Sequence, residues 1–133
     1  MKKITLLLVI IFTFLFSTTS WGEWKFVIKT VESHKFYYDK DRVRKSGKYI
    51  YYWELMDLFE PKGEVGSEYS SSMMYKQLDC SIFRYKRLNI IIHKDSMGEG
   101  EVVMEWDPED KWTYPPPDTI SDKIHYKICE EQQ

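Results

Sequence analysis

The chain has 133 residues, of which 17% are aromatic and 30% are charged. Lys2 and Lys3 belong to an N-terminal segment that is treated separately below. Without them, the 19 basic residues become 17 against 21 acidic ones, a net charge of −4. This balance gives no attraction to nucleic acid or to an anionic membrane surface, so both are excluded as binding partners.

The beginning of the chain has the pattern of a secretory signal peptide. Two lysines precede residues 4–16, a run of 13 residues without charge, and small residues follow. The run is shorter than the roughly 20 apolar residues that span a bilayer, which favours a cleaved signal over a membrane anchor. Cleavage after Ser20 and cleavage after Gly22 both fit. We predict a signal peptide at 1–22 and one exported domain at 23–133, located in the periplasm, at the cell surface or outside the cell.

Two cysteines, Cys80 and Cys129, are present in the whole chain. Disulfides persist outside the cytoplasm, and two cysteines permit one intramolecular pair. Two separate buried thiols are the alternative, and the absence of a C-x-x-C motif disfavours a redox or zinc role. We predict a structural disulfide that closes a loop of about 50 residues and contributes roughly 4 kcal/mol.

Six segments have the alternating, aromatic and β-branched composition of strands. They are residues 24–30, 35–39, 49–59, 69–79, 81–93 and 100–106. The segment 69–79 is ambiguous between strand and helix, and we favour strand. Residues 40–48 between the second and third strands read as a basic loop with a turn at Ser46 and Gly47.

The C-terminal segment has a helical pattern instead. Its isoleucines recur at every fourth position, as Ile120, Ile124 and Ile128. Thr119 followed by Asp122 resembles a capping box, and Asp118 is an alternative N-cap. We predict a helix over 119–129 that packs its isoleucines on the sheet and brings Cys129 close to Cys80.

The sequence has little that points to catalysis. Its three histidines, His34, His93 and His125, occur singly, without the spacing of metal ligands, and no G-x-S-x-G motif is present. Two pairs of carboxylates stand close in sequence, Glu54 with Asp57 and Glu99 with Glu101. We interpret both pairs as solvated edges or loops, and we predict no metal, no cofactor and no catalytic residue.

Basic residues occur in two groups that are candidates for partner binding. They are Arg42, Arg44, Lys45 and Lys48 in the predicted loop, and Arg84, Lys86 and Arg87 interleaved with Phe83 and Tyr85. Enrichment in Arg, Tyr and Trp is typical of protein interfaces, so these groups fit an acidic protein surface or a sulfated glycan. An ordinary solvated surface is the alternative.

Several short motifs, in this order, resemble the surface-adhesin protein E family of Gram-negative bacteria. They are YYD at 37–39, a strand centred on Trp53 and Leu55, serines followed by Tyr75, Leu78, Asp79 and Cys80, MGEG at 97–100, Trp112 with prolines, and YKIC ending at Cys129. The resemblance implies an α+β fold: one twisted antiparallel sheet of about six strands with a C-terminal helix tethered by the Cys80–Cys129 disulfide. The family's namesake is a lipoprotein, whereas no lipid-attachment cysteine stands near the predicted cleavage sites.

The resemblance also implies a function. Family members are cell-surface or periplasmic proteins, and the namesake adhesin binds host matrix and plasma proteins. We therefore expect an adhesin-like protein-binding module without catalytic activity, whose partner is a host matrix protein or another envelope protein. A homodimer stays open, and a small periplasmic enzyme or ligand carrier is the alternative function.

Overall fold

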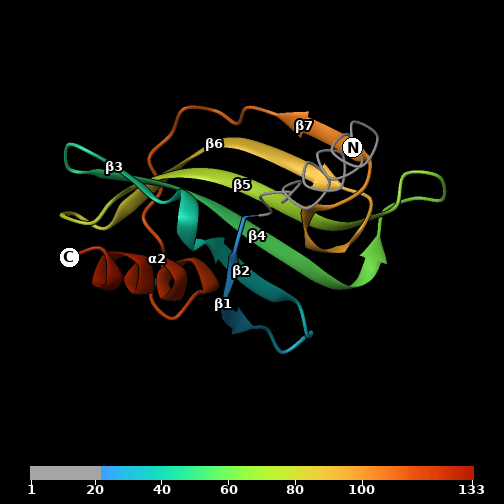
Figure 1. Cartoon of the computed structure of the whole chain (residues 1–133), viewed down its shortest axis with the longest axis horizontal. Coiled ribbons are helices and arrows are strands. Elements are labelled where there is room, and N and C mark those ends of the chain that lie inside the picture. The colour runs from blue at the N-terminus through green and yellow to red at the C-terminus, as the bar shows by residue number, and fades with distance from the viewer. Residues whose placement is uncertain (1–21) are drawn as a thin grey trace, which may run out of the picture.

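The computed structural model describes residues 22–133, and its elements form one sheet and one long helix (Figure 1). The predicted signal peptide, apart from Gly22, lies outside the described residues. The strands are β1 Trp24–Lys29, β2 Lys35–Asp39, β3 Arg44–Ser46, β4 Tyr49–Lys62, β5 Tyr69–Asp79, β6 Arg84–His93 and β7 Val102–Trp106. The helix is α2 Ile120–Glu131, and two short 3-10 turns are η1 Lys40–Arg42 and η2 Ser96–Gly98.

The sheet is antiparallel throughout, with the strand order β1-β2-β4-β5-β6-β7. The predicted α+β fold is confirmed, with one strand more than expected because β3 also pairs with the start of β4. The prediction of a loop over 40–48 was therefore wrong in its second half. Gly47 has a φ of 60°, which glycine adopts without strain, and this turn lets Arg44–Ser46 fold back onto β4.

Residues alternate between the two faces of β4, as the strand period of two requires. Ile50 and Tyr52 are buried on the face that α2 covers, which we call the helix face. Tyr51 and Trp53 lie on the opposite face, which we call the outer face, and both are half-buried. The alternation of residues 49–59 in the sequence indicates the same division into two faces. The single helix α2 covers only part of the helix face.

The predicted C-terminal helix is confirmed, and it begins where the capping pattern placed it. The Thr119 side chain accepts a hydrogen bond of 3.2 Å from the backbone N–H of Asp122. Ile124 and Ile128 are fully buried against the sheet, as their spacing predicted. Cys129 in the last turns forms the predicted disulfide with Cys80, which follows β5 directly.

An ion pair and a hydrogen bond hold the end of α2 against the first two strands. The Lys25 ammonium lies 2.7 Å from the Glu131 carboxylate, and the Tyr38 hydroxyl donates to the same carboxylate. Burial acts to raise the pKa of Glu131, but the hydrogen bonds from Lys25 and Tyr38, together with the nearby positive charges, lower it overall. The helix is thus fastened to β1 and β2 near its C-terminus, besides its disulfide link to the end of β5.

One carboxylate lies where the sequence did not predict it. Glu54 is only 2% exposed, beneath the helix face, so the interpretation of Glu54 as a solvated edge residue was wrong. Its carboxylate lies 2.7 Å from the equally buried Lys76 ammonium and accepts a 3.1 Å hydrogen bond from the Tyr52 hydroxyl. A charge enters a core only with such partners, and the partner comes from the neighbouring strand β5, far away in sequence.

Candidate functional site: a basic and aromatic strip on the outer face

Three aromatic rings lie side by side on the outer face of β4 and β5. Trp53 and Tyr75 are directly paired across the strands, and their ring centroids lie 5.0 Å apart at an interplanar angle of 30°. Tyr51 approaches Tyr75 with a centroid distance of 6.2 Å. Because β4 alternates, Tyr51 and Trp53 share this face, and they make a surface of stacked rings that is half-exposed to solvent.

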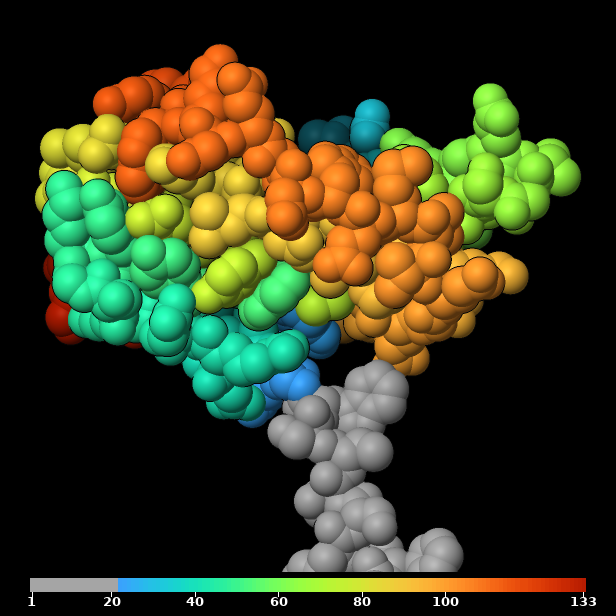
Figure 2. All heavy atoms as spheres, turned by 90° about the horizontal axis from the view of Figure 1, so that it is seen from above, coloured from blue at the N-terminus to red at the C-terminus, as the bar shows by residue number. Residues whose placement is uncertain are grey.

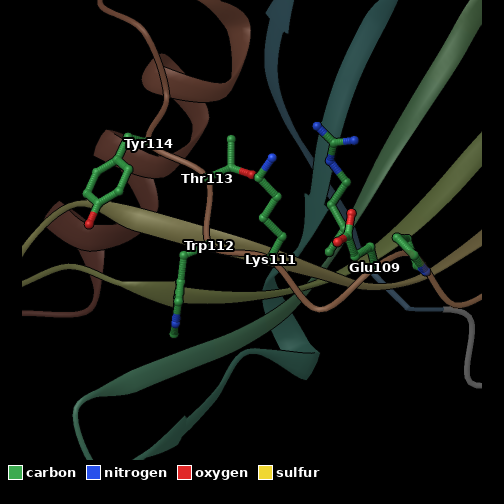
Figure 3. A pocket seen from close by; sticks show the side chains of 7 residues that line it. Glu109, Lys111, Trp112, Thr113 and Tyr114 are labelled. Carbon is green, nitrogen blue, oxygen red and sulfur yellow. The ribbon is translucent and has the colours of Figure 1, made fainter.

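Trp112 extends this row from a segment that follows β7. The backbone of Thr113 pairs with Tyr85 of β6 through hydrogen bonds of 2.9 and 2.8 Å, which places the segment along the start of β6. Lys111 and Thr113 point to one side of the segment and Trp112 to the other (Figure 3). The Trp112 ring lies 5.7 Å from the Tyr49 ring at an angle of 32°.

Basic side chains lie over these rings. The Arg44 guanidinium lies 4.7 Å from the centroid of Tyr51, and the Lys48 ammonium lies 5.2 Å from that of Tyr49. Two further cations share Trp112, with Arg84 at 4.1 Å and Lys86 at 4.7 Å from its ring centroid. We call this set the outer-face strip: Tyr49, Tyr51, Trp53, Tyr75 and Trp112 with Arg44, Lys48, Arg84 and Lys86.

Figure 2 shows the outer face, with α2 on the far side of the molecule. Atoms of β4 and β5 reach the surface in a strip between the β3 region and the orange segment that contains and follows β7. The face is bordered by these two segments rather than closed by them. It offers a surface for contact and not an enclosed cavity.

Two carboxylates compensate part of the charge. Asp79 is fully buried and lies 3.4 Å from both Lys48 and Arg84. Although burial acts to raise the pKa of Asp79, hydrogen bonds from Ser81 and Lys48 lower it overall, so the carboxylate is held ionised. Asp110, by contrast, is 79% exposed and lies 2.5 Å from the Lys86 ammonium.

The structure thus brings together four of the seven predicted basic residues, from two different segments of the chain. The other three lie elsewhere. Arg42 binds the buried carboxylate of Asp39, and Lys45 donates to the backbone carbonyl of Gln132 after the helix. Arg87 approaches the Tyr85 hydroxyl at 3.4 Å and lines a hollow of about 550 Å³ beside Thr113 and Tyr114.

Sequence reasoning missed Tyr75, Trp112 and Asp110 as members of this site or its neighbours. Tyr75 is recognisable only once the register places it opposite Trp53. For Trp112 and Asp110, no local pattern announces a contact with β6, because the segment after β7 is neither strand nor helix.

One cross-strand row resembles a hydrolytic constellation but is arranged otherwise. Asp57, Ser71 and His93 are paired opposite one another on neighbouring strands. The Ser71 hydroxyl donates to the backbone carbonyl of Asp95 at 2.6 Å and accepts from the Gly98 N–H at 2.9 Å. The serine therefore anchors η2 to the sheet, and it makes no hydrogen bond to His93, whose ring nitrogens have no partner.

Residues 22–133 contain neither a cluster of metal ligands nor a membrane-spanning helix. In this range no three His, Cys, Asp or Glu side chains gather closely enough to hold a metal ion. In the same part of the chain, no helix combines the length and hydropathy needed to cross a bilayer.

The architecture defines a class: α+β domains in which one tethered helix covers part of one face of an open antiparallel sheet. Within that class, the model of the family Surface-adhesin protein E matches residues 24–130, which is most of the chain. The chain belongs to this family of surface adhesins, and the resemblance stated from the sequence motifs is confirmed.

Solved structures of the same fold agree with this assignment. The structure of Haemophilus influenzae protein E superposes with a TM-score of 0.62 at 17% identity, covering 86% of this chain and 89% of that chain. Its crystal form II gives a TM-score of 0.64 at 17% identity, covering 86% and 92%. A comparison with curated protein sequences found no match.

Proposed function

We propose that this protein is an exported, adhesin-like binding module without catalytic activity, and that it contacts a protein partner through the outer-face strip. The partner is a host matrix protein or another protein of the bacterial envelope. Membership of the surface-adhesin family supports export and binding as the general role. The structural observation that carries the proposal is the row of half-exposed Tyr and Trp rings flanked by cations on the face opposite α2.

Composition and shape of the strip both favour a protein interface. Aromatic and arginine side chains most often dominate the energy of such interfaces. Tyr and Trp bury a large area while losing few rotamers, and the planar guanidinium of Arg makes several oriented hydrogen bonds. Trp53 and Tyr75 lie at one end of the strip, and the cations lie over Tyr51, Tyr49 and Trp112 toward the other end. An apolar patch bordered by charged groups is typical of a protein interface.

The alternative function, an enzyme or ligand carrier, has less support. It would require a deep apolar pocket with convergent polar groups. The hollow lined by Arg87 and Trp112 is open to solvent and lined by charged as well as apolar side chains, and the row around Ser71 is committed to hydrogen bonds with η2.

The test uses protein recovered from the envelope of cells that express the full chain. Its binding to a panel of purified matrix proteins is measured by biolayer interferometry, with Trp53→Ala compared against the wild type. Loss of a tryptophan that anchors an interface weakens binding by about 2 kcal/mol or more, which is a factor of about 30. We expect a loss of this size for at least one partner.

Tyr126→Ala is the matched control. Tyr126 is also a large exposed aromatic residue, but it lies on α2, at 65% exposure, on the other side of the sheet. If Trp53→Ala and the wild type bind every partner with equal affinity, the outer-face strip is not part of the interface. Thermal unfolding of each variant verifies that the fold is intact.

A further inference from the structure

We propose that the outer-face strip recognises a sulfated polysaccharide, such as the sulfated chains that matrix proteins carry. The inference rests on the proposed function, because it names the chemistry that this same surface would bind. Its basis is the convergence of several cations on stacked rings at one end of the strip. In addition, an exposed carboxylate forms an ion pair with one of these cations.

Three of the four cations are grouped around the Tyr49 and Trp112 rings, and the fourth, Arg44, lies over Tyr51. Arg84 and Lys86 approach the same Trp112 ring, and Lys48 lies over Tyr49, whose ring stacks on Trp112. A sulfate ester presents three terminal oxygens that accept hydrogen bonds from several donors at once, whereas a carboxylate presents two. Convergent Arg and Lys donors therefore match sulfate better than they match a single acidic side chain.

The charge at this point remains positive after its internal partners are counted. Lys48 and Arg84 share one buried carboxylate, that of Asp79, so one positive charge of this pair is uncompensated. Arg44 adds another cation farther along, over Tyr51. A linear polyanion laid along the strip would meet cations at successive points, and each ion pair formed releases condensed counterions from the polyanion.

The rings supply the second part of the recognition. Tyr51, Trp53 and Tyr75 continue from the cations as a half-exposed stacked row. The C–H face of a sugar ring is apolar and packs on the face of an aromatic ring, while its hydroxyl groups stay in water. A sulfated sugar chain thus matches both the rings and the cations, which an acidic peptide does only in part.

The Asp110 carboxylate pairs with Lys86 and would compete with a sulfate group for this cation. Its side chain is 79% exposed, and its partner Lys86 is 18% exposed against Trp112. Such an exposed carboxylate contributes little to stability, so an incoming sulfate can displace it at small cost. Removing its charge should therefore strengthen binding of a polyanion, an effect that damage to the fold cannot imitate.

The experiment measures Kd for heparin by isothermal titration calorimetry at low and at moderate salt. Completely desulfated heparin and poly-L-glutamate are the comparison ligands. We expect Arg84→Gln/Lys86→Gln to weaken heparin binding about tenfold and to reduce its salt dependence, as loss of two ionic contacts does. Asp110→Asn should strengthen heparin binding about threefold, because a like charge is removed from the site. Lys29→Gln/Lys123→Gln, which removes two exposed lysines of β1 and α2, is the charge-matched control and should change Kd little.

Several results would overturn the inference. They are equal binding of heparin and desulfated heparin, tighter binding of poly-L-glutamate than of heparin, equal losses in the double variant and its control, or no gain from Asp110→Asn. Failure of the proposed function is a separate result. If a matrix protein binds in a Trp53-dependent way while heparin does not bind, the protein-binding role stands and the sulfated ligand is wrong.

Discussion

At the scale of single residues, the core beneath α2 contains several buried polar side chains. His125 is fully buried among the rings of Tyr52, Phe83 and Tyr85, and neither of its ring nitrogens has a hydrogen-bond partner. Burial, and secondarily the nearby charge of Lys76, lowers its pKa to about 2. The imidazole is therefore neutral in the folded protein at neutral and at mildly acidic pH.

This burial predicts a sensitivity to acid that originates at one side chain. The unfolded chain binds a proton at His125 below pH 6.5, whereas the folded chain does so only near pH 2, so stability is lost as pH falls between these values. Between pH 7 and about pH 4.5 this costs the wild type roughly 2–3 kcal/mol, a loss that His125→Leu should not suffer. Urea unfolding of both proteins at the two pH values measures it. Equal losses in the two proteins would contradict the neutral buried imidazole.

At the scale of elements, α2 is defined by its cap and by one stripe of isoleucines. The stripe faces the sheet while Lys123 points to solvent, so the helix depends on tertiary packing and not on the propensity of its twelve residues alone. The β3–β4 hairpin shows the opposite case. Residues Arg44–Ser46 were predicted as part of a basic loop because they are polar and precede a turn. They form a strand only because they pair with β4.

Truncation of one isoleucine should weaken the helix strongly. Ile124→Ala removes a fully buried side chain and is expected to cost about 2–5 kcal/mol, because the cavity it leaves is closed only partly. Lys123→Ala is the matched control on the exposed face and should change stability by less than about 0.5 kcal/mol. Chemical denaturation measures both. If the two variants unfold alike, α2 is not packed as described.

At the scale of the whole molecule, the fold is held by a link between chain segments that are far apart. The disulfide joins the end of β5 to α2 across 49 residues, and the ion pair of Lys25 with Glu131 fastens the same helix to β1. The same overall architecture occurs in Haemophilus influenzae protein E at 17% identity. At this identity most side chains differ, so the arrangement of the strands and the helix is shared although most residues are not.

Reduction of the disulfide tests the importance of the long link. Closing a loop of this length removes about 4 kcal/mol of chain entropy from the unfolded state, so reduction should lower Tm by roughly 15 °C. Scanning calorimetry with and without reductant gives the shift. The thiol count of the denatured protein without reductant should be zero, and alkylation of both cysteines under that condition would contradict the bond.

Much of the fold was predictable because its elements depend on local periodicity. The alternation in residues 49–59 separated the two faces of β4, and the spacing of isoleucines located α2. The boundaries of the elements were less accurate, and β6 is an example. Strand β6 begins at Arg84 and not at residue 81, since Phe83 has a φ of 49°, in the left-handed region, which interrupts the extended run.

The sequence by itself determined the pairing of the cysteines, because only two are present, and the family, because its short motifs occur in order along the chain. The class of fold followed from the resemblance to that family. The sequence also indicated basic residues as candidates for binding, without distinguishing Arg84 from Arg87. Only the tertiary structure decided which of these residues lie together. The alternation of β6 sends the two arginines to opposite faces, and the register of β4 and β5 pairs Trp53 with Tyr75. The Thr113–Tyr85 bridge brings Trp112 to Arg84. Contacts of this kind join residues that are distant in sequence, and no local pattern encodes them.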